Sequence, residues 1–171
     1  MPTPTPGALK SSFPAIVDAA TRVLVLGSLP GEVSLLRREY YGHPQNQFWR
    51  LMGEVTGREL IGLAYPERLD ALLAAGVGLW DVIKSAERVG SLDAHIRSHS
   101  PNPLAAFVVG LPALRAIGFN GAKAAAIGAR QLADLAKGPQ LIFLPSSSPA
   151  HAIGFERKRT EWMKLKPFLE G

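Results

Sequence analysis

The sequence predicts an α/β fold: a three-layer α/β/α sandwich around a mainly parallel sheet of about four strands. Short aliphatic runs, each the length of a buried strand, alternate along the chain with segments whose apolar residues recur at helical spacing. Polar loops follow the first and the last of these runs. Because the carboxyl ends of parallel strands lie at one edge of a sheet, these loops are expected to face each other and to hold a ligand there.

The first half of the chain contains two expected strands and two expected helices. Residues 22–26 are mostly aliphatic and run into Gly27, which is typical of a buried parallel strand. Apolar residues recur every three or four positions over residues 48–55 and again over residues 66–75, so both segments are expected to be helices packed on the sheet. Residues 77–83 are the second expected strand.

Residues 103–109 allow two interpretations. The run from Phe107 to Val109 has strand propensity, whereas Pro103 suits the first turn of a helix, and we favour the helix. The remaining elements are expected in the order strand 116–119, helix 122–136, strand 140–144 and helix 155–169.

Composition narrows the classes of function. The 171 residues include 19 Lys and Arg against 14 Asp and Glu, a net charge of +5 that permits a polyanionic partner without requiring one. The chain has no cysteine, which excludes disulfides, cysteine nucleophiles and cysteine-ligated zinc or iron–sulfur sites. Neither a signal peptide nor a membrane span is recognisable. We expect a single cytoplasmic domain over residues 1–171, with a flexible segment at residues 1–12.

Three loops are more polar than turns require, at residues 27–46, 81–93 and 145–151. The first is the richest, because it leads into a segment that alternates aromatic rings with hydrogen-bonding side chains, the components of a site for a flat heterocycle. Within that segment, Phe48 and Trp49 share helical spacing with the apolar residues that follow, so their rings are expected to point into the core.

Six short motifs occur in a fixed order along almost the whole chain. They are Gly27-Ser28-Leu29-Pro30-Gly31, Tyr40-Tyr41-Gly42-His43-Pro44 with Asn46 and Phe48-Trp49, Leu79-Trp80-Asp81-Val82, Gly90-Ser91-Leu92-Asp93, Phe119-Asn120-Gly121, and Leu144-Pro145 through His151. The series resembles the hypoxanthine-DNA glycosylases, the sixth family of the uracil-DNA glycosylase superfamily. The resemblance implies a monofunctional enzyme of base excision repair. Such an enzyme flips a deaminated base, preferably hypoxanthine, out of DNA and leaves an abasic site, acting as a monomer without cofactor or metal.

The resemblance assigns the catalytic role to Asn46. Mismatch-specific relatives carry an Asn at the position of Leu29 that places the attacking water, and several relatives carry a catalytic His at the position of Leu144. Aliphatic side chains have no polar atom for either task. The carbonyl oxygen of Asn46 can accept from a water and its amide can donate to the base. The alternative is a loop Asn that only satisfies neighbouring backbone groups.

Four residues of the first motif region are candidates for binding the base. Tyr41 occupies the position at which mismatch-specific relatives stack an aromatic ring on the flipped base, an interaction worth about 1–3 kcal/mol. His43 is a candidate contact to a phosphate or to the base, or else a structural residue of a tight His-Pro loop. The backbone at Gly27 and Ser28 can approach O6 or N7 of hypoxanthine closely.

The last loop is the candidate DNA contact. Ser146, Ser147 and Ser148 resemble the superfamily's second motif, which grips phosphates and enters the space vacated by the flipped base, and His151 follows them. The alternative is an ordinary cluster of serines that caps the following helix.

Other polar residues are expected to be structural. Asp81 ends a strand, and we expect structural hydrogen bonding from it rather than a role in orienting a loop or water. Nothing favours Lys84 as a Schiff-base nucleophile, and residues 157–159 are expected to form a solvated basic helix face. Family members commonly carry Asp after the Asn at position 102, whereas this chain has Pro103, a change expected to affect a helix cap or loop.

Three alternatives remain open. Uracil can be the main substrate of the same reaction. The absence of polar side chains at Leu29 and Leu144 also fits a non-catalytic module that binds damaged DNA. A hydrolase of free nucleosides is a third alternative, and its substrate binding would depend little on salt.

Overall fold

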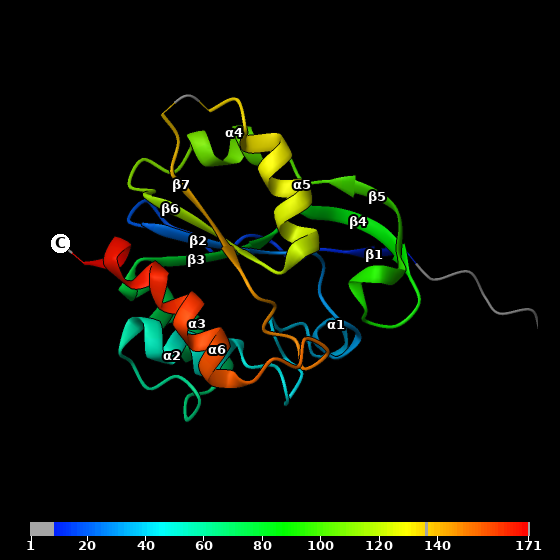
Figure 1. Ribbon diagram of the computed structural model, residues 1–171, viewed down its shortest axis with the longest axis horizontal. Coiled ribbons are helices and arrows are strands. Elements are labelled where there is room, and N and C mark those ends of the chain that lie inside the picture. Colours follow the sequence, from blue (N-terminus) through cyan, green and yellow to red (C-terminus); the bar gives the residue numbers. More distant parts are fainter. Residues whose placement is uncertain (1–8, 136, 171) are drawn as a thin grey trace, which may run out of the picture.

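The computed structural model describes residues 9–135 and 137–170. Its central sheet has four parallel strands in the order β3-β2-β6-β7, with helices on both faces (Figure 1). The strands are β2 (Val23–Gly27), β3 (Val77–Asp81), β6 (Ala116–Asn120) and β7 (Gln140–Leu144). The predicted three-layer α/β/α sandwich on a parallel sheet is confirmed.

The helices divide between the two faces of this sheet. One face carries α2 (Phe48–Thr56), α3 (Tyr65–Ala75) and α6 (Phe155–Trp162), and the other carries α4 (Leu104–Val109) and α5 (Ala122–Leu132) (Figure 1). The expected helices at 48–55 and 66–75 are confirmed, as is the helix favoured for residues 103–109. No helix in the described part of the chain is long and apolar enough to cross a bilayer.

The core consists of two apolar clusters, one on each side of the sheet. Phe48 and Trp49 lie in the first cluster with Trp162, so their expected inward orientation is confirmed. Leu29 and Phe119 lie in the second cluster. Every residue of the two inner strands is buried, which explains why both are almost continuously apolar in sequence.

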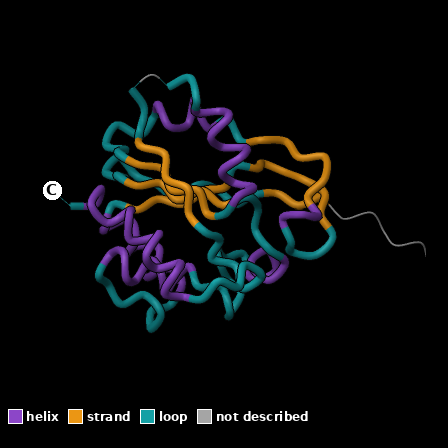
Figure 2. The backbone as a smooth tube through the Cα atoms, in the orientation of Figure 1, coloured by secondary structure: helices purple, strands orange, loops and turns teal. Residues whose placement is uncertain are grey.

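A second, antiparallel sheet was not predicted. It has the strand order β1-β4-β5 and lies beside the central sheet (Figure 2). The chain passes from β3 into β4 with only Val82 between them, so the expected strand at 77–83 is two strands, and the expected loop at 81–93 is largely sheet. The strands are β1 (Leu9–Ser11), β4 (Ile83–Arg88) and β5 (Ile96–Pro101).

Four smaller differences concern the bounds of elements and loops. Residues 9–11 of the expected flexible segment 1–12 pair with β4, and residues 1–8 lie outside the described residues. A short helix, α1 (Glu32–Arg37), lies within the expected loop 27–46. The closing helix gives way after α6 to a 3-10 segment, Met163–Leu169, in which Pro167 lacks the N–H that an α-helix would use. Helix α5 ends at Leu132, short of the predicted end at 136, a residue outside the described part.

Candidate active site

A cleft of about 580 Å³ opens at the carboxyl edge of the central sheet. The loops after β2 and β7 form facing walls, as their positions after parallel strands require. All the predicted site residues line the cleft: Gly27, Ser28, Tyr41, His43, Asn46, Ser146, Ser147, Ser148 and His151. Asp81 and Asn120, at the ends of β3 and β6, complete it.

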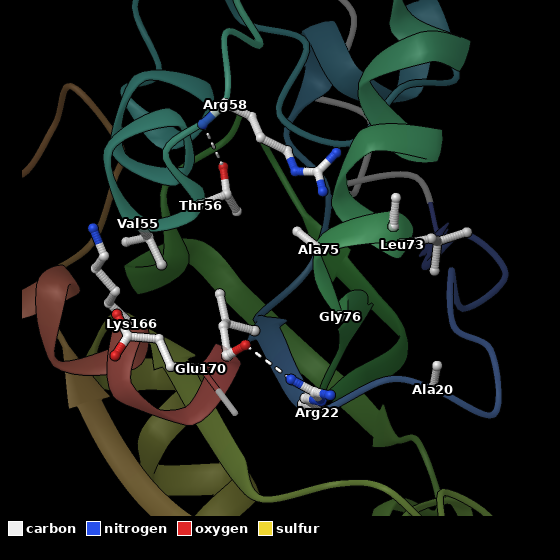
Figure 3. Close-up of a pocket in the computed structure, with 12 residues that line it drawn as sticks. Ala20, Arg22, Val55, Thr56, Arg58, Leu73, Ala75, Gly76, Lys166 and Glu170 are labelled. Carbon is white, nitrogen blue, oxygen red and sulfur yellow. Dashed lines mark hydrogen bonds between the residues drawn. The ribbon is translucent and has the colours of Figure 1, made fainter.

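Another cavity, of about 450 Å³, lies at the opposite end of the sheet, where β2 begins (Figure 3). Arg22 in this cavity donates to the backbone oxygen of Leu169 at 2.9 Å, so its guanidinium fastens the carboxyl-terminal segment. None of the predicted site residues lines the cavity. The chemistry suggested by the motifs therefore belongs to the cleft at the carboxyl edge.

Asn46 lies in the cleft and also stabilises the start of α2. Its Oδ1 accepts a hydrogen bond from the backbone N–H of Phe48 at 2.9 Å, which is the local role considered as the alternative. This bond fixes the plane of the amide. The Nδ2 group has no acceptor among the described residues, so both amide hydrogens are available to a ligand, and Oδ1 keeps a second lone pair.

Tyr41 is held firmly in a strained conformation. Its φ of 53° is in the left-handed region, and the indole Nε1 of Trp49 donates to its backbone oxygen at 3.2 Å. The ring stacks on Phe48 with centroids 3.9 Å apart and planes 17° apart. One face of the Tyr41 ring is therefore covered by the core, and a base has only the other face on which to stack.

His43 is exposed on the wall of the cleft, and its ring also shapes its own loop. The Nδ1 atom accepts a hydrogen bond from the backbone N–H of Gln45 at 3.0 Å. In the neutral ring the proton is therefore on Nε2, which is a donor. The structural and ligand-binding interpretations of His43 are compatible with each other.

Asn120 anchors the last loop to the end of β6. Its Nδ2 donates to Oγ of Ser147 at 2.9 Å, and its Oδ1 accepts from the Ser147 backbone N–H at 2.8 Å. The backbone oxygen of Ser147 in turn accepts from the backbone N–H of Gln47 at 3.0 Å, which joins the two walls of the cleft. Ser147 is 1% exposed and its hydroxyl holds the loop to Asn120, so a phosphate contact from it stays a prediction.

The other serines make local bonds as well. Oγ of Ser146 accepts from the N–H of Ser148 at 3.1 Å, and Oγ of Ser148 accepts from the N–H of Ala150 at 3.2 Å. Both hydroxyls keep a hydrogen to donate. His151 is exposed at the rim. A phosphate contact from Ser146, Ser148 or His151 stays a prediction.

The prediction that residues 157–159 form a solvated basic helix face is wrong at Lys158. It is 1% exposed, and its Nζ donates to the backbone oxygen of Ser148 at 3.0 Å, so it supports the last loop from behind. Burial lowers the pKa of the Lys158 ammonium. Its neighbours do face outward: Arg157 is exposed, and Arg159 pairs with Glu54 at 3.3 Å.

Arg88 fixes the loop after β2 and was missed by the sequence analysis. This buried guanidinium donates to the backbone oxygens of Pro30 and Gly90, and it lies 3.8 Å from Asp93. Asp93 accepts from Oγ of Ser28 at 2.6 Å. The network joins the second sheet to the first motif. Arg88 lies outside every motif, and only its position in an alternating strand hinted at its burial.

Asp81 differs from its expected structural role. Its carboxyl group is buried at the end of β3, and Oδ2 has no hydrogen-bond partner in the described part of the chain. Burial, aided by Asp93 and opposed by Arg88, raises the pKa of Asp81 to about 7. Only the backbone oxygen of Asp81 is used structurally, as the acceptor for Nδ2 of Asn102 at 2.7 Å.

Gln131 explains how the chain tolerates Pro103. Pro103 precedes α4 and offers no side-chain cap. Instead, Oε1 of Gln131 accepts from the N–H of Leu104 at 3.0 Å, and its Nε2 donates to the backbone oxygen of Asn102 at 2.9 Å. An amide from α5 thus serves the start of α4, where Pro103 offers no cap.

Leu29 and Leu144, where the resemblance implied polar residues in some relatives, are part of the core here. Leu29 is packed in the apolar cluster with Val82 and Ile83, and Leu144 is packed in the opposite cluster. Neither offers a polar group to the cleft. Lys84, on β4, is exposed and does not line the cleft. In the described residues, no group of three or more His, Asp or Glu could hold a metal ion.

Comparison with known proteins identifies the family. The sequence matches the family model described as the uracil DNA glycosylase superfamily over residues 14–170. The chain belongs to the uracil DNA glycosylase superfamily. The activity expected from the motif series, that of a DNA glycosylase, is confirmed, and DNA is the substrate.

Relatives within the superfamily cover nearly the whole chain. A Methanosarcina barkeri protein named hypoxanthine DNA glycosylase is 38% identical over 153 residues, which is 90% of this chain and 95% of the relative. A Methanosarcina acetivorans protein of the same name is 39% identical over 154 residues, 90% of this chain and 96% of the relative. A solution NMR structure from M. acetivorans, described as a candidate uracil DNA glycosylase, superposes with a TM-score of 0.85 at 37% identity and covers 96% and 100% of the two chains.

Proposed function

We propose that the protein removes hypoxanthine from DNA by hydrolysing the N-glycosidic bond of deoxyinosine and leaving an abasic site. It acts in base excision repair in the cytoplasm, as a single domain and as a monomer. The two relatives named hypoxanthine DNA glycosylase support the choice of base.

The observation that carries the proposal is the free amide of Asn46 in the cleft. Hydrolysis of an N-glycosidic bond passes through a cationic sugar while negative charge grows on the departing base. The Phe48 N–H holds one side of the Asn46 amide, so its geometry is set before substrate binds. Nδ2 then donates to the base, or Oδ1 places the attacking water.

The surroundings of Asn46 suit a flipped purine. A cleft of about 580 Å³ is within the range of sites that enclose small ligands. Tyr41 offers one ring face for stacking, and Nε2–H of His43 is a further donor at the wall. Glycine is required at position 27, since the Asp81 carboxyl and the Tyr41 hydroxyl lie where a side chain would be.

A panel of oligonucleotides tests the proposal. Duplexes that contain hypoxanthine, uracil or xanthine are incubated with enzyme, and abasic sites are cleaved by alkali and counted on a gel. We expect hypoxanthine to be released fastest. If uracil is released faster, the base assignment is wrong. Uracil is the base named for the M. acetivorans structure. If no base is released although DNA binds, the protein is a binding module.

Variants at position 46 separate catalysis from folding. Asn46→Ala removes both the amide and the cap of α2, whereas Asn46→Asp keeps an oxygen for the Phe48 N–H and loses the amide hydrogens. We expect both to reduce excision by about 100-fold or more while DNA binding changes little. Gln45→Ala, at an exposed neighbour in the same loop, is the matched control and should keep wild-type activity.

Salt dependence tests the alternative of free nucleosides. Binding to DNA releases counterions, so affinity for the duplex should fall steeply as salt rises. Equal turnover of deoxyinosine and of the duplex, with little effect of salt, would instead indicate a nucleoside hydrolase.

A further inference from the structure

Unpaired polar atoms gather around the cleft. Three buried side-chain polar atoms in the described residues have no hydrogen-bond partner: the hydroxyl of Tyr41, Oδ2 of Asp81 and Nη1 of Arg88. Tyr41 and Asp81 line the cleft, and Arg88 holds its first loop. A buried polar group without a partner lowers stability, so groups of this kind in a site imply a partner that arrives with the substrate.

Gly27 shows where two of these groups meet. A Cβ on Gly27 would lie 2.7 Å from Oδ1 of Asp81 and 2.9 Å from the hydroxyl of Tyr41. The carboxyl group and the hydroxyl are therefore neighbours under the same backbone segment, at the floor of the cleft. Because Asp81 and Tyr41 both line the cleft that contains Asn46, the Asp81 carboxyl lies beside the space proposed for the base.

We propose that Asp81 is a catalytic acid that donates its proton to N7 of the departing hypoxanthine. The proposal rests on the proposed function, because N7 belongs to the purine ring. As the bond between C1′ and N9 breaks, its electron pair goes to the base and N7 takes the Asp81 proton. A water oxygen bonds to C1′, and the proton that this water loses passes to solvent, from which the Asp81 carboxylate is protonated again.

The environment of the Asp81 carboxyl favours its protonated form. Four ionisable groups are near enough to interact electrostatically with the Asp81 carboxyl. They are Tyr40 and Tyr41 before α2, Arg88 on β4 and Asp93 after β4. Burial and Asp93 favour the neutral carboxyl, and they outweigh Arg88, so the pKa of Asp81 rises to about 7. An acid with a pKa near the working pH is well matched to proton transfer.

A substrate analogue tests the proposal in the wild-type enzyme. In 7-deazahypoxanthine a carbon replaces N7, so the acid has no atom to protonate. Single-turnover excision from matched duplexes is measured between about pH 6 and about pH 9. We expect hypoxanthine release to fall about tenfold per pH unit above pH 7. Release of 7-deazahypoxanthine should be at least about 100-fold slower at low pH and independent of pH in this range.

A variant gives the reciprocal test. Asp81→Asn keeps the size of the side chain and removes the transferable proton, so we expect hypoxanthine release to become slow and flat with pH, and 7-deazahypoxanthine release to be unchanged. Asp70→Asn, at an exposed aspartate on α3, is the matched control and should keep the wild-type profile. Thermal melting and duplex binding confirm that each variant is folded.

The outcomes distinguish this inference from the proposed function. Equal rates and equal pH profiles for the two bases with wild-type enzyme would overturn the role of Asp81 alone, and so would a wild-type profile for Asp81→Asn. Failure of wild-type enzyme to release hypoxanthine from any duplex would overturn the proposed function and the acid together.

Discussion

Asn120 and Ser147 exchange two hydrogen bonds across the carboxyl edge of the sheet, at 2.9 Å and 2.8 Å. Both residues are buried, and the pair ties the loop after β7 to the end of β6. One wall of the cleft is therefore positioned by an amide on the neighbouring strand rather than by the loop's own turns.

Ser147→Ala should destabilise the protein by about 1–3 kcal/mol, because Nδ2 of Asn120 would be left buried without an acceptor. Urea unfolding measures the loss. Ser148→Ala, whose hydroxyl caps a more exposed N–H, is the control and should cost about 0.5 kcal/mol or less. Similar losses for the two variants would contradict the importance of the Asn120 contact.

Arg88→Met should lower the free energy of unfolding by about 3 kcal/mol, since it removes the donors to Pro30 and Gly90 and the charge that faces Asp93. Excision should also slow, because the loop after β2 loses its support. Arg97→Met on the adjacent strand is the control: Arg97 is exposed and bonds only to nearby backbone. An unchanged excision rate in a folded Arg88→Met enzyme would show that the loop holds its shape unaided.

Gln131→Ala should destabilise α4 by about 1 kcal/mol, because the Leu104 N–H loses its side-chain acceptor and keeps only the backbone oxygen of Asn102. Adding Pro103→Asp should restore part of the loss, since a carboxylate at that position can cap the helix. A double-mutant cycle by thermal unfolding measures the coupling between positions 103 and 131. Additive effects would refute the idea that Gln131 substitutes for an acidic cap.

The stability of the protein should depend on the ionisation of Asp81. Its pKa is about 7 in the folded protein, against an ordinary value of 3.8 for an aspartate in an unfolded chain, so folding favours the protonated form. This contribution to stability is complete below about pH 4 and is lost as pH rises to about 7. Asp81→Asn should therefore be more stable than wild type at pH 8, with a smaller difference at pH 4. Chemical unfolding at both values measures it, and a difference that does not change with pH would place the Asp81 pKa near its ordinary value.

Much of the fold could be predicted from short-range patterns. The inner strands are apolar along their whole length, and α2 has clear helical periodicity, so both were found from residue type alone. The second sheet was missed because β4 lacks strict alternation: buried Ile83 and Ala86 are three positions apart, in a stretch where the pairing with β5 shifts register. Its partners are three- and six-residue strands whose pairing depends on distant sequence. Such pairing leaves little trace in local periodicity.

The cleft was predicted for a topological reason, and its supporting residues were not. Loops after parallel strands meet at one edge, which brought Ser28, Asn46 and Ser147 together as expected. Arg88 reaches the first loop from β4 and Lys158 reaches the last loop from α6, and residue type alone does not distinguish either from a surface residue. The sequence also could not show that Oδ2 of Asp81 has no hydrogen-bond partner among the described residues, because this depends on where every other donor lies in the fold.

The hydrogen bond from Trp49 Nε1 to the backbone oxygen of Tyr41 joins the Tyr41 ring of the cleft to the core. Trp49 belongs to the core under α2, and Phe48 stacks on the Tyr41 ring. The orientation of the Tyr41 ring is therefore set by core residues that no ligand touches. A substitution in the core beneath α2 can consequently change which nucleobase the cleft accepts, although every side chain that touches the base stays the same. Selection for a new lesion need not begin at the surface that touches it.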